Sequence, residues 1–123
     1  MDAKEYNLEK RTYDFALSCR AFLKTRTWPP VSWTDVQQLL RSSGSVAANF
    51  VEAAEALSND DFVYRVRICK KEAKESNLWL QLLGDSNELP PESTAFIRQL
   101  RAETAELVRI FASIIKKRLT TTK

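Results

Sequence analysis

Residues 59–83 read NDDFVYRVRICKKEAKESNLWLQLL. Small or apolar side chains recur in this stretch at alternating spacings of four and three residues, at Phe62, Val66, Cys69, Ala73, Ser76, Leu80 and Leu83. This alternation places them on one face of an α-helix and is typical of a helix packed at a shallow angle against its neighbours. Ser58 followed by Asp61 resembles a capping box at its start. The stretch therefore predicts a long helix with one buried seam.

Three further stretches have helical patterns, and clusters of helix-breaking residues separate them. The breakers lie at 28–30, 57–60 and 84–91, so we expect helices over roughly 4–26, 34–56, 59–83 and 91–119. In the first, Phe15, Cys19 and Phe22 mark the apolar face, whereas Arg20 falls on the face expected to be wet. Long helices joined by short connections favour antiparallel neighbours. We predict one all-α domain over residues 1–123, an up-down-up-down antiparallel four-helix bundle.

The composition argues against an enzyme. The chain has no His, which removes the commonest general base and a frequent metal ligand. A di-iron centre in a helical bundle uses Glu-x-x-His pairs, so Glu52, Glu72 and Glu75 are expected to be structural or surface carboxylates. The sequence has no Gly-rich phosphate loop and no Cys-x-x-Cys pair. We expect no catalytic residue, no metal and no cofactor.

The expected location is the cytoplasm, without a membrane segment. The first residues lack a secretory signal, and no apolar run approaches the ~18 residues that a span requires. In a reducing compartment Cys19 and Cys69 would be thiols. Both fall on apolar faces, so we interpret them as buried structural thiols rather than as a disulfide or a reactive nucleophile.

A polar line follows the second helix beside its apolar stripe, at Arg41, Ser45, Asn49 and Glu52. It could be a solvated face or the lining of a ligand pocket. Ser and Asn are mediocre helix formers, which favours a third interpretation, a hydrogen-bonded network between the second and third helices. In that network Glu52 would pair with Arg65 or Lys71.

Apolar residues exceed what one seam can bury. Leu78 and Trp79 fall outside the seam of the third helix, and the fourth helix has a second apolar set at Ile97, Val108, Phe111 and Ile115. An exposed apolar patch on a small chain favours self-association, and a symmetric homo-oligomer is its usual form. We therefore expect a second copy of this chain as a partner.

The positive charge is concentrated at the C-terminal end. The chain has a net charge of +3, yet residues 109–123 contain five basic residues and no acidic one, whereas residues 34–56 carry a net −2. A candidate nucleic-acid-binding surface comprises Arg98, Arg101, Arg109, Lys116, Lys117 and Arg118. The alternative is that these residues only keep a helix end soluble. No exposed aromatic run lies among them, so sequence-specific readout of RNA or DNA is not indicated.

Three stretches resemble a known family in the same order and spacing. They are residues 41–53 (RSSGSVAANFVEA), Ser58-x-x-Asp61-Phe62, and residues 71–83 (KEAKESNLWLQLL). They are similar to the bacterial four-helix bundle family encoded by intervening sequences in 23S ribosomal RNA genes, also called S23-like. The resemblance implies a ring-shaped homopentamer with no established enzymatic activity. The family's motif positions, taken as a structural polar framework, are Arg41, Ser42, Ser45, Asn49, Glu52 and Asp61.

Two functional hypotheses follow. The first is a non-enzymatic oligomeric interaction module. The second is a weak, non-sequence-specific RNA- or DNA-binding accessory protein that uses a basic surface of the oligomer. The family is also similar to the accessory protein of diversity-generating retroelements, which supports the second hypothesis by analogy.

Overall fold

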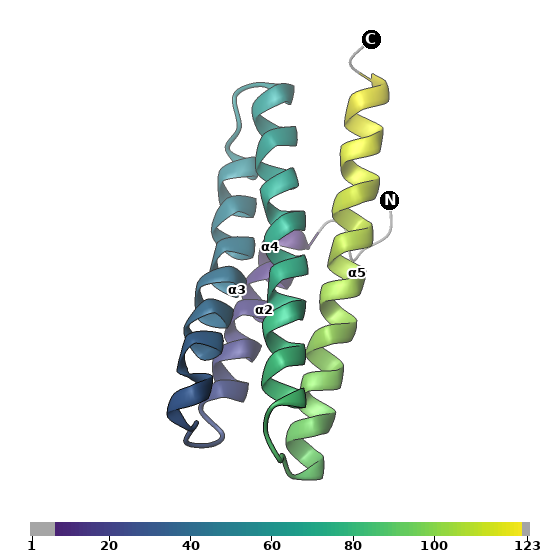
Figure 1. The fold of residues 1–123 in the computed structure, drawn as a ribbon. Coiled ribbons are helices and arrows are strands. Elements are labelled where there is room, and N and C mark those ends of the chain that lie inside the picture. Colours follow the sequence, from purple (N-terminus) through teal and green to yellow (C-terminus); the bar gives the residue numbers. More distant parts are fainter. Residues whose placement is uncertain (1–6, 122–123) are drawn as a thin grey trace.

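The structure is a computed structural model that describes residues 7–121. It contains four α-helices and one short 3-10 turn: α2 (Leu8–Leu23), η1 (Pro30–Ser32), α3 (Trp33–Ala54), α4 (Asn59–Asp85) and α5 (Pro91–Thr121). Successive helices run in opposite directions and pack side by side (Figure 1). The described part of the chain is an all-α bundle with up-down topology, as the sequence predicts. The helix α2 packs mainly on α3 and much less on α5.

Local sequence explains where the helices begin and end. The hydroxyl of Ser58 accepts a hydrogen bond from the backbone N–H of Asp61 at 3.0 Å, which caps α4. Pro91 opens α5, where its missing N–H costs nothing. The helix α2 ends at Leu23, three residues before the expected boundary. Its expected start, residue 4, lies outside the described residues.

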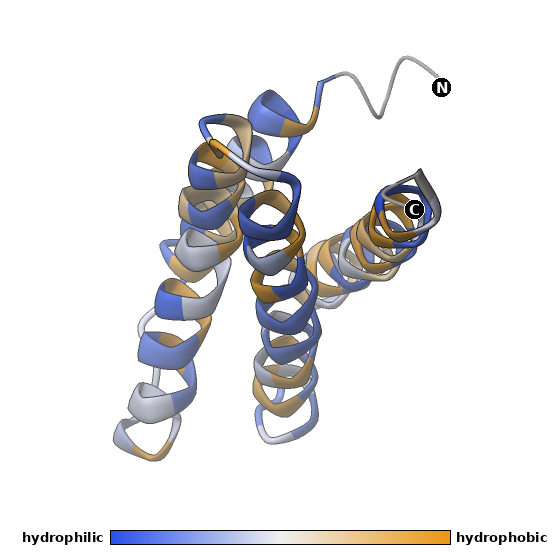
Figure 2. Cartoon of the chain, turned by 90° about the horizontal axis from the view of Figure 1, so that it is seen from above, coloured by the Kyte–Doolittle hydropathy of each residue, from blue (hydrophilic) through white to orange (hydrophobic). Residues whose placement is uncertain are grey.

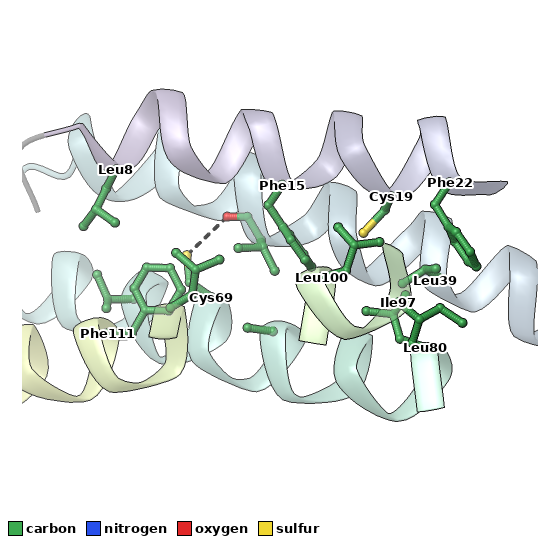
Figure 3. Packing of buried hydrophobic residues seen from close by; sticks show 14 of the residues in the cluster. Leu8, Phe15, Cys19, Phe22, Leu39, Cys69, Leu80, Ile97, Leu100 and Phe111 are labelled. Carbon is green, nitrogen blue, oxygen red and sulfur yellow. Dashed lines mark hydrogen bonds between the residues drawn. The ribbon is translucent and has the colours of Figure 1, made fainter. Parts of the chain in front are cut away.

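The core lies between the helices, and α4 contributes its most regular layer. Val66, Cys69, Ala73, Leu80 and Leu83 are fully buried, as is Ser76, which confirms the seam; Phe62 at its end is only partly buried. Figure 3 shows side chains from all four helices meeting in this layer, among them Phe15, Phe22, Leu39 and Phe111. The thiol of Cys69 lies 3.5 Å from the backbone oxygen of Val46 and donates to it.

Two expectations about apolar residues are wrong. Ile97, Phe111 and Ile115 on α5 are buried rather than exposed, because α5 packs against both α4 and α2 and needs a broad apolar face. Conversely, Val51, which its spacing in the sequence places on the apolar stripe of the second helix, is 53% exposed in α3, since the inward direction at this end of α3 is taken by Ala53. Apart from Leu119, which is 46% exposed, the exposed large hydrophobic residues of the described chain therefore lie elsewhere than on α5.

Hydrophilic and hydrophobic residues alternate along each helix, as they do in amphipathic helices (Figure 2). Charged residues interrupt every helix described between residues 7 and 121, and none has the length and apolarity to cross a membrane.

Candidate functional site

The polar centre of the α3–α4 interface is a set of ion pairs around Arg41. Its guanidinium donates from Nη1 to Glu72 Oε2 at 2.8 Å and from Nη2 to Glu75 Oε1 at 2.8 Å. Its Nε donates to the side-chain oxygen of Gln38 at 2.9 Å. Arg41 thus closes the edge of the helix pair over a carboxylate that is almost fully buried.

Two opposing effects set the pKa of Glu72. Burial acts to raise this pKa, but the hydrogen bonds from Arg41 and Ser45 and the positive charge of Arg41 together outweigh it. The pKa of Glu72 is therefore lowered from its ordinary value. The same hydrogen bond to Glu72 raises the pKa of Arg41, so both groups are charged at neutral pH.

Behind this pair, hydroxyl groups join the two helices. Ser42 Oγ and Ser76 Oγ are 2.8 Å apart and both residues are fully buried. Ser76 also donates to the backbone oxygen of Glu72 at 2.9 Å. A hydroxyl has one proton, so Ser42 is the donor in the Ser42–Ser76 bond.

One helical turn further along α3, an amide continues the polar line. Asn49 donates to the backbone and side-chain oxygens of Ser45, each at 3.0 Å, and accepts from Arg65 Nη1 at 3.1 Å. The structure thus brings together Arg41, Ser42, Ser45 and Asn49 along one seam.

The two remaining framework residues lie apart from this seam. Glu52 is exposed and forms no ion pair among residues 7–121, so the expected pairing with Arg65 or Lys71 is wrong. The physical reason is that Asn49 lies closer to α4 and takes up the guanidinium of Arg65. Asp61 takes part in the α4 cap through its backbone N–H, and its side chain is exposed.

The cysteines offer no nucleophile. Cys19 and Cys69 are free and buried, and burial raises the pKa of each thiol to about 12. The reactive thiolate is therefore a negligible fraction at neutral pH. Within the described part of the chain, no group of three or more Cys, Asp or Glu residues is arranged to hold a metal ion.

A groove lies between α4 and α5, and we call it the α4–α5 groove. It has a volume of about 910 Å³, and Ile97, Ala105 and Val108 contribute to its lining. Four cationic residues and one acidic residue also line it: Lys74, Arg98, Arg101, Arg109 and Asp85. None of these four cations forms an ion pair within residues 7–121, in contrast to Arg41.

Three of the six predicted nucleic-acid-binding residues, Arg98, Arg101 and Arg109, therefore meet in this groove. Asn77 on α4 accepts from Arg101 Nε at 2.9 Å and holds its guanidinium against the groove wall. Gly84 allows α5 to come close, because a Cβ at this position would lie 3.3 Å from Ile97 Cδ1.

The other three predicted residues lie at the far end of α5. Lys116 follows Arg109 by seven residues, so it lies on the same side of the helix about 10 Å further along. Arg118 has a structural role: its guanidinium stacks on the ring of Phe62 at 3.8 Å and donates to Asn59 Oδ1 at 2.9 Å. Of the six residues, only Arg98, Arg101 and Arg109 line the α4–α5 groove.

Two arginines of α2 make contacts that were not expected from the sequence. Arg20, expected on the wet face, donates to the backbone oxygen of Leu40 and to the hydroxyl of Ser43, each at 3.3 Å. Gly44 leaves room for it, since a Cβ there would lie 3.1 Å from Arg20 Nη2. A glycine inside a helical pattern was the available signal.

The second missed contact joins the first and last helices. Arg11 on α2 donates to Glu103 at 2.8 Å and lies 3.0 Å from Glu106 on α5. Hydrogen bonding to Glu103 raises the pKa of Arg11 further above its ordinary value, against the opposing effect of burial.

Comparison with known proteins identifies the family. The family model for the 23S rRNA-intervening sequence protein matches residues 4–113. The chain belongs to this family. A solved structure from Bacteroides thetaiotaomicron VPI-5482, a protein with unknown function from the S23 ribosomal protein family, is similar to it. The two are 28% identical with a TM-score of 0.79, over 92% of this chain and 98% of that chain. No curated protein matches the chain.

Membership of the 23S rRNA-intervening sequence protein family gives the bundle a known relative but assigns it no activity, because the similar structure is itself of unknown function. In this family member, the polar side chains of the α3–α4 seam are hydrogen-bonded to one another, as Arg41 is to Glu72 and Ser42 to Ser76. The cations that line the α4–α5 groove have no ion-pair partner among residues 7–121. The groove is therefore the better candidate for a functional surface.

Proposed function

We propose that this protein is a non-enzymatic cytoplasmic interaction module that assembles into a homo-oligomer, with five copies in a ring. The observation that carries the proposal is the amount of apolar side chain left in water. Among residues 7–120, ten large hydrophobic residues are exposed, and Leu57 and Val31 are 99% and 83% exposed. Three others, Tyr64, Leu78 and Leu82, share the outward face of α4. Exposed apolar side chains in this number on a small protein favour association.

The proposed assembly predicts a mass. In multi-angle light scattering at micromolar concentration, a pentamer would have close to five times the 14.1 kDa of one chain. The double variant Leu78→Lys/Leu82→Lys tests whether the outward face of α4 takes part, and Lys24→Glu, at the residue that follows α2, is an exposed control. A wild-type mass of 14.1 kDa would eliminate the proposal.

A second candidate function is non-sequence-specific binding of RNA or DNA. The observation in its favour is that Arg98, Arg101 and Arg109 line one groove without carboxylate partners among the described residues. In a homopentamer the net charge of +3 per chain becomes +15. Phosphate contacts release counterions, so affinity should fall steeply with salt.

The test is a titration of single-stranded RNA at 50 and 200 mM salt. The variant Arg98→Glu/Arg109→Glu should bind at least tenfold more weakly than wild type and with a shallower salt dependence, whereas Lys24→Glu should bind like wild type. Absence of binding at 50 mM salt would remove this candidate.

A further inference from the structure

The α4–α5 groove combines apolar lining residues with an excess of positive charge. Val108 is half-buried and Ala105 is exposed, so both offer apolar contact in the groove, and the largely buried Ile97 also contributes to its lining. Around them, the groove has four cations against the single carboxylate of Asp85. Arg101 is fixed through Nε by Asn77, and its terminal nitrogen atoms have no hydrogen-bond or ion-pair partner among residues 7–121. A ligand with carboxylates and one hydrophobic side chain would match both features.

The chain itself carries such a segment at the connection between α3 and α4. We call residues 52–61 the α3–α4 corner. Its only large hydrophobic residue outside the helices is Leu57, which is 99% exposed. The corner holds four exposed acidic residues and no basic one: Glu52, Glu55, Asp60 and Asp61. The charge of the corner is thus opposite to that of the groove.

The corner is held in a defined shape, so that docking it would order little additional chain. The backbone N–H of Ala56 donates to Ala53 at 3.1 Å, and Ser58 caps the first turn of α4. Asn59 is bonded through both side-chain atoms to Arg118 on α5. Preorganisation of this kind lowers the entropic cost of association.

A chain cannot place its corner in its own groove. The groove follows residues 74–85 of α4 and 94–109 of α5, toward the end of the bundle where these two helices are joined. The corner lies at the opposite end, at the top of Figure 1. Any contact between them must therefore join two copies.

We infer that the α4–α5 groove of one copy receives the α3–α4 corner of a second copy, with Leu57 against the apolar lining and the acidic residues facing the cations. This inference rests on the proposed homo-oligomer and names its interface. The two surfaces differ, so the contact is heterologous: it leaves one groove and one corner free at each step, and closes into a ring when the rotation allows.

The first experiment is sedimentation velocity on the full chain over a range of micromolar concentrations. Leu57→Asp should weaken assembly at least tenfold, because it removes the anchor and adds a charge. Val31→Asp is the matched control, since Val31 is also exposed, at 83%, but lies in the connection between α2 and α3. Val31→Asp should assemble like wild type. Both side chains are in solvent, so circular dichroism should show folded helices in both variants.

The second experiment mixes two variants that fail for different reasons. Arg98→Glu/Arg109→Glu has a defective groove and an intact corner, and Leu57→Asp has the reverse. Each alone should remain at 14.1 kDa, and the equimolar mixture should form a species of twice that mass and nothing larger. A single intact contact per pair cannot propagate, and only a heterologous contact gives this result.

The outcomes separate the inference from the function on which it rests. A wild-type monomer would overturn both. A wild-type oligomer that Leu57→Asp does not weaken, or that both aspartate variants weaken equally, would overturn the inference and leave the homo-oligomer standing. If the groove variant loses RNA binding while it keeps the wild-type mass, the groove binds nucleic acid and the corner does not occupy it.

Discussion

The two buried serines of the α3–α4 seam make an unequal pair, and this inequality is measurable. Ser76→Ala would leave the fully buried hydroxyl of Ser42 without an acceptor. An unsatisfied buried donor costs ~1–3 kcal/mol of unfolding free energy. Ser42→Ala is milder, because Ser76 still donates to the backbone oxygen of Glu72 at 2.9 Å. Loss of one ordinary hydrogen bond costs ~0.5–1.5 kcal/mol.

The double variant Ser42→Ala/Ser76→Ala distinguishes these contributions. It removes both hydroxyls and leaves no orphaned donor, and alanine is the better helix former. We therefore expect the double variant to be more stable than Ser76→Ala alone, by ~1 kcal/mol. For a domain of this size that difference corresponds to roughly 4 °C in melting temperature.

The measurement is urea unfolding followed by circular dichroism, with every variant at the same protein concentration because assembly would add to apparent stability. Ser86→Ala is the control: its hydroxyl also bonds a backbone oxygen four residues back, that of Leu82, but is exposed, so the change should stay within ~0.5 kcal/mol. If adding Ser42→Ala to Ser76→Ala lowers stability further, Ser42 is not the donor in the bond between the two hydroxyls.

Three further predictions concern burial and charge. Leu80→Ala should lower the free energy of unfolding in urea by ~3–5 kcal/mol, because Leu80 is fully buried, whereas Leu78→Ala should lower it by under ~1 kcal/mol in the monomer, because Leu78 is 46% exposed. Equal losses would show that the burial of these two side chains is wrongly assigned. The pKa of Glu72 is lower in the folded protein than its ordinary value of 4.5, so the ionised carboxylate stabilises the fold above about pH 4.5, and this stabilisation is lost as the pH falls through the pKa of the folded state. Glu72→Gln should therefore make the free energy of unfolding less dependent on pH below about pH 5. A disulfide reagent at pH 8 should leave Cys19 and Cys69 unmodified in the folded protein and modify both in denaturant, since burial raises each pKa to about 12; rapid reaction of either would show that its site opens.

The spacing of apolar residues predicts the buried side chains correctly where a helix has a single apolar face. On α4 the alternation of four and three selects positions that point the same way, so the buried seam could be read directly from the spacing. On α5 the same reasoning misassigned Phe111 and Ile115 as surplus. A helix packed against two neighbours buries a wide arc, and a linear pattern cannot say how many neighbours it has.

Polar partners were harder to predict than the core. The pattern on α3 indicated a network with α4, but it assigned the ion pair to Glu52 rather than to Glu72. Long side chains such as Arg41 reach over several Å, so the partner depends on how far the two helices are shifted along each other, which no single helix encodes. For the same reason Arg20 was expected on the solvent-exposed face of its helix, whereas it donates a hydrogen bond to the backbone oxygen of Leu40 on α3.

The stretches that carry the family resemblance meet one another in the structure. Residues 41–53 and 71–83 face each other across the α3–α4 seam, joined by Arg41 to Glu72 and by Ser42 to Ser76. Buried hydrogen bonds of this kind penalise any other alignment of the two helices, because a shift would leave several polar groups unsatisfied at once. Helix pairing accounts for Arg41, Ser42, Ser45 and Asn49, whereas the side chains of the motif residues Glu52 and Asp61 are exposed. Candidate functional residues are therefore the ones on surfaces that the bundle does not need for its own stability: Arg98, Arg109 and Leu57 outside the motif, and the exposed carboxylates of Glu52 and Asp61 within it.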